Sequence, residues 1–250
     1  MNIYETDAAV SQYLLFHYGA PEERDPFQML PNVAAFPSVC VQELPERGSL
    51  PANARALDLG CAVGRSTFEL TRLCAEVIGL DSSAAFIRAA QALKETGIHP
   101  YTRMDEGALR TSLIARVPEK LDRTRVSFRV GDAMNVPADL GSFDLVVMAN
   151  LIDRLPDPAR CLQQLPALVR RGGQVVITSP CTWLEEFTPR DKWLGGFERN
   201  GRAFTTLDAL KEILGRDFEF RFEQDVPFLI WEHRRKFQHS VAQASVWLRR

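Results

Sequence analysis

Residues 56–66 read Ala56-Leu57-Asp58-Leu59-Gly60-Cys61-Ala62-Val63-Gly64-Arg65-Ser66, and this stretch decides the fold. Its apolar and small residues, interrupted by Asp58, predict a short buried strand. Gly60 and Gly64 let the backbone turn sharply without a Cβ clash. A helix is expected to follow, and the free N–H groups of its first turn suit a ligand that carries oxygen or carboxylate groups.

A second apolar strand, Glu76-Val77-Ile78-Gly79-Leu80-Asp81, carries an acid at its carboxyl end. In open α/β sheets a carboxylate at this position hydrogen-bonds a ribose diol, so the two strands together describe a nucleoside site. The dinucleotide fingerprint G-x-G-x-x-G is missing, because the loop after Asp58 reads G-x-x-x-G. A dinucleotide is therefore not the expected ligand. The alternative to a nucleoside site is a glycine turn that binds no ligand, as in any doubly wound protein.

Beyond residue 55 the chain alternates between strands and helices, as a parallel sheet with crossover helices requires. Further strands are predicted at 126–130, 143–150 and 174–178, and helices at 66–74, 83–93 and 158–168. Asp132 follows the third strand directly, and Asn150 ends the fourth at the same sheet edge. We therefore predict a doubly wound, mostly parallel α/β sheet of seven strands.

Aromatic residues mark the N-terminal helix that is predicted from Tyr4 to Tyr18 and ends at Gly19-Ala20-Pro21. This helix either packs on the sheet as part of the core or forms a lid that places a Tyr or His over the ligand. Residues 21–51 are expected to form an irregular arm with a short helix at 39–42. The polar stretch 96–124 is interpreted as a surface insertion, without an assigned strand or helix.

The C-terminal part is expected to determine which substrate is bound. A long aromatic loop is predicted within 181–204, a helix at 206–214, and strands at 218–223 and 240–247. Between these strands, residues 227–239 gather acidic, imidazole and guanidinium groups. The segment is either a solvated loop or a site for a substrate carboxylate, whose geometry Arg matches with a bidentate fork.

Length and composition place the chain among ordinary soluble proteins. It has 250 residues, of which 46% are hydrophobic and 25% charged, so we expect a single domain over 1–250. Residues 1–50 are expected to form a lid and an arm, and residues 51–250 the core. Within the core, we expect substrate-binding insertions at 96–124, 181–204 and 227–239. A net charge of −2 gives no overall electrostatic reason to bind nucleic acid. Neither a membrane span nor a leader is recognisable, which predicts a cytoplasmic protein. The spacing of the cysteines and histidines predicts neither disulfides nor a metal site.

The ordered motifs at 57–66, 79–81, 131–133 and 150–152 resemble those of class I S-adenosylmethionine-dependent methyltransferases. A narrower resemblance is carried by Tyr4-Glu5 with residues 13–19, by 115–119 with 125–128, and by 227–230 with 235–238. These segments are similar to the 5-thiohistidine (4-mercaptohistidine) N-methyltransferases of ovothiol biosynthesis, which occur as free-standing proteins and as the C-terminal domain of 5-histidylcysteine sulfoxide synthases. Trp231 and His239 depart from the family pattern, which makes Arg234 a candidate for holding the substrate carboxylate.

The resemblance implies methyl transfer from S-adenosyl-L-methionine to the imidazole nitrogen of 5-thiohistidine nearest the backbone, giving ovothiol A and S-adenosyl-L-homocysteine. It also implies functional coupling to a sulfoxide synthase. The implied contacts to the cofactor are Asp58 and residues 60–64, including Gly60, Cys61 and Gly64, for the methionine part, Asp81 for the ribose, Asp132 and Ala133 for the adenine, and Asn150, Leu151 and Ile152 for the sulfonium side. Leu59, Arg65 and Ser82 are further implied cofactor-binding residues. The candidate substrate residues are Tyr13, His17, Tyr18, Trp183, His233 and Arg234.

Three other functions remain open from the residues alone. The first is a methyltransferase for another small nucleophile, such as a carboxylate, a phenol or a histamine-like amine. The second is a catalytically silent S-adenosylmethionine-binding scaffold, against which the polar and aromatic tail argues. The third is a nicotinamide dehydrogenase, which the spacing of the glycine loop disfavours.

Overall fold

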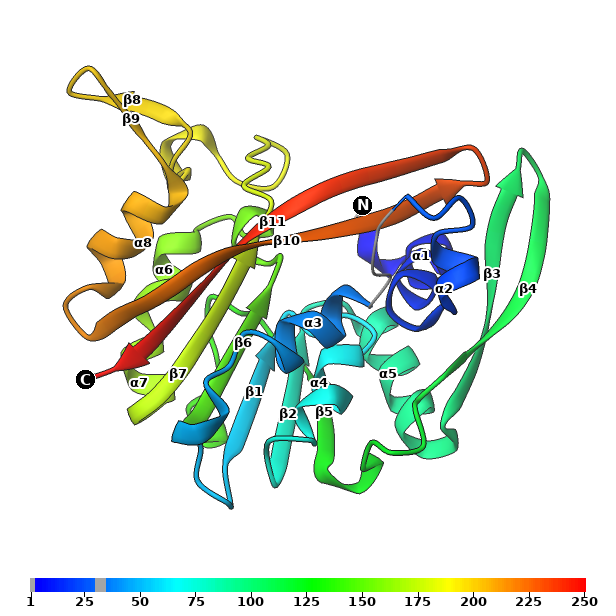
Figure 1. Ribbon diagram of the computed structural model, residues 1–250, viewed down its shortest axis with the longest axis horizontal. Coiled ribbons are helices and arrows are strands. Elements are labelled where there is room, and N and C mark those ends of the chain that lie inside the picture. The colour runs from blue at the N-terminus through cyan, green and yellow to red at the C-terminus, as the bar shows by residue number, and fades with distance from the viewer. Residues whose placement is uncertain (1–2, 30–34) are drawn as a thin grey trace.

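The computed structural model describes residues 3–29 and 35–250, which are built around a seven-stranded sheet (Figure 1). The strand order is β10-β11-β7-β6-β1-β2-β5. The five strands from β7 to β5 are parallel, whereas β11 runs antiparallel to both β7 and β10. The predicted mostly parallel α/β sheet is therefore confirmed. Its strands are β1 (Arg55–Leu59), β2 (Glu76–Asp81), β5 (Val126–Val130), β6 (Phe143–Ala149), β7 (Val169–Ser179), β10 (Phe218–His233) and β11 (Lys236–Arg249).

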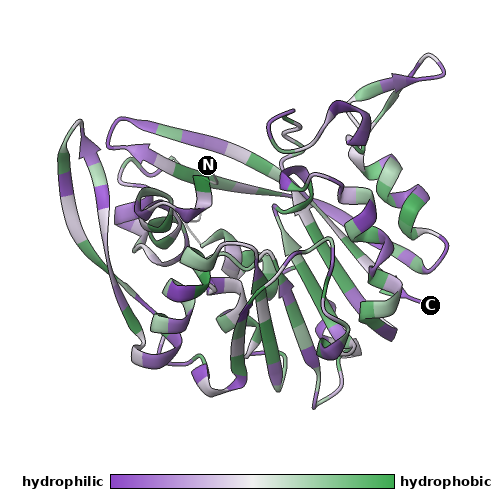
Figure 2. Ribbon diagram, turned by 180° about the vertical axis from the view of Figure 1, so that it is seen from behind, coloured by the Kyte–Doolittle hydropathy of each residue, from purple (hydrophilic) through white to green (hydrophobic). Residues whose placement is uncertain are grey.

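Helices cover both faces of the sheet, so the central strands are buried on both sides. On β6, Leu145 and Val147 pack into one hydrophobic cluster, while Val146 and Met148 pack into the other. Such continuous apolar runs are typical of parallel strands, and Figure 2 shows them along the central strands. The helices on the first face are α3 (Phe36–Gln42), α4 (Arg65–Leu70) and α5 (Ala84–Thr96), and those on the second are α6 (Pro158–Gln163), α7 (Leu165–Leu168) and α8 (Thr206–Leu214).

Two helices are shorter than the sequence predicted. The helix expected at 66–74 ends at Leu70, and the one expected at 158–168 is divided into α6 and α7. Pro166 lies at the start of α7. Because proline lacks an N–H and crowds the preceding turn, it begins a new helix instead of continuing the old one.

The N-terminal helix α1 (Asp7–Tyr18) begins one turn later than predicted. Thr6 caps it, since its hydroxyl accepts a hydrogen bond from the Ala9 N–H at 3.2 Å. Leu14 and Leu15 are buried, which anchors the helix to the first hydrophobic cluster. A short helix α2 (Pro21–Arg24) follows, and α3 begins at Phe36 where the sequence predicted a helix only from residue 39.

The insertion at 96–124 is a β-hairpin, for which the sequence assigned no strand. Strands β3 (Ile98–Glu106) and β4 (Leu109–Arg116) pair antiparallel and stand beside α1, outside the main sheet (Figure 1). The hairpin was missed because its inward residues are partly polar: Arg103 and Thr111 both bond the carboxylate of Asp105. The alternation of apolar and polar residues that would indicate strands is therefore weak in this segment.

The segment 227–239 is also strand and not loop. Strands β10 and β11 continue through it to a turn at Arg234 and Arg235, with Trp231 paired to Phe237. The tip of this long hairpin is fixed to β3, because Trp231 Nε1 donates to the Met104 carbonyl at 2.7 Å and the Arg234 N–H donates to the Asp105 carbonyl at 3.1 Å. Within 181–204, the structure forms a separate small hairpin, β8 (Phe197–Arg199) and β9 (Arg202–Phe204).

Candidate functional site

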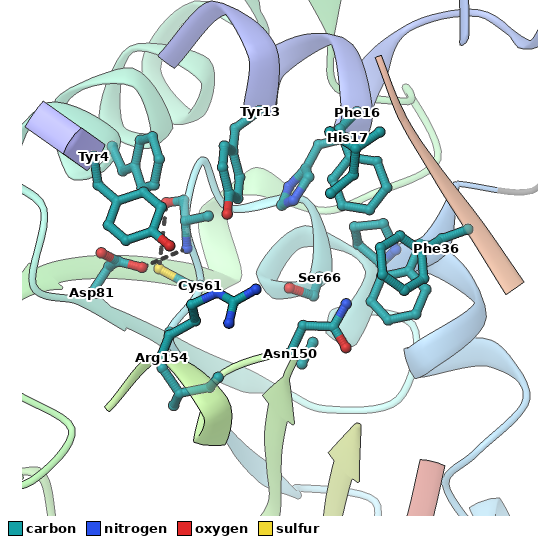
Figure 3. Close-up of a pocket in the computed structure, with 18 of the residues that line it drawn as sticks. Tyr4, Tyr13, Phe16, His17, Phe36, Cys61, Ser66, Asp81, Asn150 and Arg154 are labelled. Carbon is teal, nitrogen blue, oxygen red and sulfur yellow. Dashed lines mark hydrogen bonds between the residues drawn. The ribbon is translucent and has the colours of Figure 1, made fainter. Parts of the chain in front are cut away.

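A cavity of about 170 Å³ lies at the carboxyl ends of β1, β2 and β6, with α1 and β10 above it (Figure 3). Aromatic rings from the N-terminal region and β10 form much of its wall, and the loop after β1 forms its floor. The lining residues are Tyr4, Tyr13, Phe16, His17, Phe36, Pro37, Gly60, Cys61, Ala62, Ser66, Asp81, Ser82, Phe86, Ala149, Asn150, Leu151, Arg154, Leu155, Pro180, Phe228 and Ile230.

The loop after β1 brings its backbone close to the cavity. Gly60 has φ of +79°, and a Cβ at this position would lie 2.8 Å from Leu151 Cδ1. Ala62 also adopts a positive φ of +47°, which is strained for a residue with a side chain. Hydrogen bonds from the Gly60 and Cys61 N–H groups to the Leu80 carbonyl hold the loop against β2. The loop is therefore fixed in a shape that leaves room for a ligand.

Asp81 connects the end of β2 to this loop and faces the cavity. Its carboxylate accepts hydrogen bonds from the Ala62 N–H at 2.9 Å and the Ser83 N–H at 2.8 Å. Burial raises the pKa of this carboxyl, and the two backbone N–H groups oppose the increase. Each carboxylate oxygen has a further lone pair, so Asp81 can still accept hydrogen bonds from a diol in the cavity.

Asp58 is placed differently from the sequence expectation. It is completely buried and does not line the cavity. Its Oδ2 accepts hydrogen bonds from the hydroxyls of Ser66 and Thr67, both at 2.6 Å. Burial raises the pKa of Asp58 to about 6. The side chain therefore holds the first turn of α4 against β1, and Ser66, which the sequence reading did not single out, faces the cavity instead.

The expected cofactor residues divide into two groups. The cavity is lined by Gly60, Cys61, Asp81, Ser82, Asn150 and Leu151, whereas Asp58, Leu59, Gly64, Arg65, Asp132, Ala133 and Ile152 lie outside its lining. Asp132 is exposed but remains next to the site, because the Gly131 N–H donates to the Asp81 carbonyl at 2.9 Å. Arg65 turns toward Glu69, with which it forms an ion pair of 2.8 Å.

The expected substrate residues are separated in the same way. Tyr13 and His17 line the cavity. Tyr18 is buried and its hydroxyl donates to the Val63 carbonyl at 2.9 Å, which ties α1 to the loop. Trp183 donates from Nε1 to Thr206 and borders a different hollow, beside β8 and β9.

His233 and Arg234 lie at the turn between β10 and β11, outside the cavity lining. Their place follows from the continuation of both strands through 227–239, which carries the turn toward the β3–β4 hairpin. The residues of this segment that do line the cavity are Phe228 and Ile230. Residues 181–204 and 96–124 lie outside the lining as well, so the substrate-facing role expected of these insertions does not apply to this cavity.

Arg154 is a cavity residue that sequence reasoning missed. Its guanidinium points into the cavity (Figure 3), while one of its nitrogens donates to the carbonyls of Asp153 and Thr182 and to the Asp153 carboxylate. The guanidinium also lies 4.8 Å from the centre of the Phe187 ring. It supplies positive charge to a site that is otherwise largely aromatic. The signal was weak, because a basic residue soon after a strand is common on any surface.

His17 is neutral in this environment. Its side chain is only 6% exposed, and its Nδ1 is buried without a hydrogen-bond partner. Burial, together with the nearby positive charges of Arg65 and Arg24, lowers the pKa of His17 to about 3. The cavity therefore contains a neutral imidazole with an unpaired nitrogen.

A second cavity, of about 330 Å³, lies between α1, the β3–β4 hairpin and the tip of β10. It shares Tyr4 and Tyr13 with the first cavity. These two rings pack edge to face with centroids 6.1 Å apart, and so form the wall between the two spaces. The insertion hairpin thus contributes to the surroundings of the site without lining it.

Comparison with known proteins shows similarity to methyltransferases. Residues 57–177 match the family model described as a methyltransferase domain. A demethylmenaquinone methyltransferase from Lactiplantibacillus plantarum is 30% identical over 130 residues, covering 51% of this chain and 45% of that protein. A magnesium-protoporphyrin O-methyltransferase from Rhodobacter capsulatus is 34% identical over 152 residues, covering 60% and 54% respectively. The chain thus spans about half the length of these curated relatives.

A solved structure agrees with the sequence relatives. A SAM-dependent methyltransferase from Methanosarcina mazei has a TM-score of 0.52 at 17% identity, covering 81% of this chain and 95% of that chain. The fold is therefore that of the class I S-adenosylmethionine-dependent methyltransferases, and residues 57–177 are similar to a methyltransferase domain. S-adenosyl-L-methionine is the cofactor of this class. The cavity-lining turn at residues 60–62, with its small side chains, and the cavity-facing carboxylate of Asp81 fit its methionine and ribose parts.

Two kinds of feature are absent from residues 3–29 and 35–250. Helices long and apolar enough to cross a membrane are absent from this part of the chain. Clusters of His, Cys, Asp or Glu side chains that could hold a metal ion are absent from it too.

Proposed function

We propose that this chain transfers the methyl group of S-adenosyl-L-methionine to the ring nitrogen of 5-thiohistidine nearest the backbone, giving ovothiol A. One observation supports this best. The segments that carry the resemblance to the ovothiol methyltransferases, on α1 and β10, supply Tyr13, Phe16, His17, Phe228 and Ile230 to the cavity beside the cofactor loop.

The walls of the cavity suit a flat acceptor ring. The rings of Phe16, Phe36 and Phe228 pack against one another, with centroids 4.8 to 6.0 Å apart. The ring of Tyr13 lies 4.7 Å from that of Phe86. Aromatic side chains arranged in this way hold another ring by stacking and edge contacts. Such walls fix the orientation of an imidazole, and orientation is the main requirement of this reaction.

We assign to Arg154 the carboxylate-binding role for which the sequence made Arg234 a candidate. Because its guanidinium faces the cavity, it can pair with the thiolate or the carboxylate of 5-thiohistidine. Cys61 also lines the cavity, but burial raises the pKa of its thiol well above the usual value. Cys61 therefore stays protonated and does not compete as a nucleophile.

The reaction needs no obligatory general base. The sulfonium group of the cofactor supplies an electrophilic methyl carbon, and the electron pair of the broken C–S bond stays on sulfur. The acceptor reacts as the ring thiolate with one hydrogen on the far ring nitrogen, so the methylated product is charge-balanced. The protein has to hold the near nitrogen in line with the methyl group and keep the sulfur away from it.

The decisive experiment is mass spectrometry of the products formed from the protein, S-adenosyl-L-methionine and 5-thiohistidine, with nuclear magnetic resonance to locate the new methyl group. We expect one added methyl group, on the nitrogen nearest the backbone. The Asp81→Ala variant and histidine as acceptor are the controls. Methylation of a phenol, a carboxylate or an amine in a parallel panel, with none of 5-thiohistidine, would point to another acceptor. Tight cofactor binding without any methylated product would indicate a scaffold.

A sulfoxide synthase that makes the precursor is the proposed functional partner. The supporting argument is the resemblance to domains that are fused to such synthases. At a fixed concentration of 5-thiohistidine, adding a 5-histidylcysteine sulfoxide synthase should increase the rate of ovothiol formation over the rate without the synthase. An unchanged rate would mean that the two proteins act independently.

A further inference from the structure

We propose that His17 accepts a hydrogen bond from the ring N–H of the methyl acceptor and thereby decides which ring nitrogen is methylated. This inference rests on the proposed function and gives one cavity residue a defined positioning role. The acceptor class it requires is an azole ring, whose single ring hydrogen can reside on either of two nitrogens.

The first argument is the unpaired nitrogen. His17 lies on α1, lines the cavity and points into it beside the rings of Tyr13 and Phe16, at centroid distances of 5.8 and 5.3 Å (Figure 3). Its Nδ1 has no hydrogen-bond partner although it is buried. Nearly all buried polar groups in proteins are paired, and an exception at a cavity wall is best explained by a ligand. A donor on the bound acceptor would complete this bond.

The second argument concerns the charge of the imidazole. Arg65 donates to the His17 carbonyl at 3.0 Å, so a guanidinium lies close to the ring and disfavours protonation. A neutral imidazole has one N–H and one bare nitrogen. With its hydrogen on Nε2, His17 offers Nδ1 as an acceptor. Neutrality matters as well, because a cationic imidazole would repel the sulfonium of the cofactor.

The third argument comes from the geometry of an azole acceptor. The two ring nitrogens point to different sides of the ring, so a ring held below α1 presents one nitrogen to His17 and the other to the cofactor loop. When Nδ1 of His17 binds the hydrogen on the far nitrogen, the near nitrogen keeps its lone pair. That lone pair forms the new bond to the methyl carbon, the C–S bond breaks with its electrons on sulfur, and the hydrogen stays where His17 holds it.

The test compares three variants with the wild-type protein. His17→Leu removes the acceptor nitrogen, His17→Asn places an amide oxygen near the position of Nδ1, and His99→Leu removes a histidine on β3 that lies outside the cavity. The wild type and His99→Leu should give a single product. We expect His17→Leu to lose at least tenfold in kcat/KM for 5-thiohistidine and to form isomers methylated at the far nitrogen or at sulfur. His17→Asn should restore the single product.

A structural role of His17 would change stability and total activity without changing the product ratio. An unchanged ratio in His17→Leu therefore overturns the proposal. Calorimetry with S-adenosyl-L-homocysteine provides a second criterion: affinity should stay within twofold in all variants, and a tenfold loss in His17→Leu would assign the residue to the cofactor instead.

A measurement that needs no turnover separates this proposal from the proposed function. In wild-type protein labelled with ¹⁵N-histidine and saturated with S-adenosyl-L-homocysteine, adding 5-thiohistidine should shift the Nδ1 resonance of His17. An unmoved resonance at saturating 5-thiohistidine overturns the hydrogen bond. A shifted resonance in a protein that forms no methylated 5-thiohistidine supports the hydrogen bond and refutes the proposed reaction.

Discussion

The hydroxyl of Ser66 donates a 2.6 Å hydrogen bond to the buried carboxylate of Asp58. This bond joins the first turn of α4 to the end of β1, and Thr67 makes a second one of equal length to the same oxygen. Asp58, which precedes the glycine loop, therefore acts indirectly: it fixes the end of α4 that borders the cavity.

The Asp58→Ala substitution should lower the free energy of unfolding by about 2 to 4 kcal/mol, because it leaves two buried hydroxyls without their acceptor. Asp58→Asn keeps an acceptor oxygen and should lose less. Urea denaturation checks both values. The matched control is Asp139→Ala, which removes an exposed ion pair with Arg129 and should have little effect. Equal stability of Asp58→Ala and the control would contradict the tethering role.

The Asp81→Ala substitution should weaken S-adenosyl-L-methionine binding by about 1.5 to 3 kcal/mol, the usual value for hydrogen bonds to a charged group. The reason is that Asp81 is the carboxylate that both holds the loop and faces the cavity. Isothermal titration calorimetry measures the effect, with Asp139→Ala again as control. If the affinity does not change, Asp81 does not bind the ribose.

The Gly60→Ala substitution should reduce cofactor affinity more than tenfold and lower stability by about 1 to 3 kcal/mol. The new Cβ would meet Leu151 at 2.8 Å in a backbone conformation that side chains rarely adopt. Gly48→Ala is the matched control, because no atom lies within 4 Å of the Cβ it introduces. Calorimetry measures the cofactor affinity of both variants, and thermal denaturation measures their stability. Equal affinity and equal stability of the two variants would argue against a tightly packed loop at Gly60.

Acid should destabilise the wild-type protein through His17. The pKa of His17 in the folded protein, about 3, lies below the ordinary value of 6.5. Below pH 6.5 the unfolded chain therefore binds a proton at His17 that the folded chain does not bind. Stability from this residue is complete above pH 6.5 and is lost as the pH falls toward 3. Between pH 7 and pH 5 the loss should be about 2 kcal/mol.

The His17→Asn variant isolates this effect, since both proteins keep every other titrating group, including Asp58 and Asp81. Urea denaturation at pH 7 and pH 5 should show a stability loss that is about 2 kcal/mol smaller in the variant. Parallel losses in the two proteins would mean that His17 is protonated in the folded state or accessible to solvent.

The sheet could be predicted from the sequence because its central strands are buried on both faces. Residues 145–149 of β6 are apolar throughout, and Asp81 and Asp132, which follow the apolar parts of β2 and β5, lie at the same edge of the sheet. The β3–β4 hairpin could not be predicted in this way, because much of its surface is polar. Its position depends on contacts distant in sequence, such as the bond from Trp231 to Met104.

The cavity itself was predicted only in part. Gly60 and Asp81 follow from local rules about loops and strand ends. By contrast, Phe36, Phe86 and Phe228 reach the site through tertiary packing, and their sequence positions resemble those of any core residue. Arg234 was favoured because it lies in a basic segment, yet the length of β10 and β11 carries it beyond the cavity.

Arg154 and Arg234 provide the sharpest test of which cation faces the acceptor. The Arg154→Gln substitution should raise KM for 5-thiohistidine about 10- to 100-fold, which corresponds to the loss of one charge-assisted bond. Arg154→Lys keeps the charge and should lose less, whereas Arg234→Gln should leave KM within twofold, because its side chain is exposed at the hairpin turn. Since Arg154 also bonds Asp153 and Thr182, thermal denaturation must show that each variant is folded. A large increase in KM for Arg234→Gln, with none for Arg154→Gln, would mean that the acceptor binds nearer the hairpin tip, in the space between α1 and β3, and would move the proposed acceptor site to the second cavity.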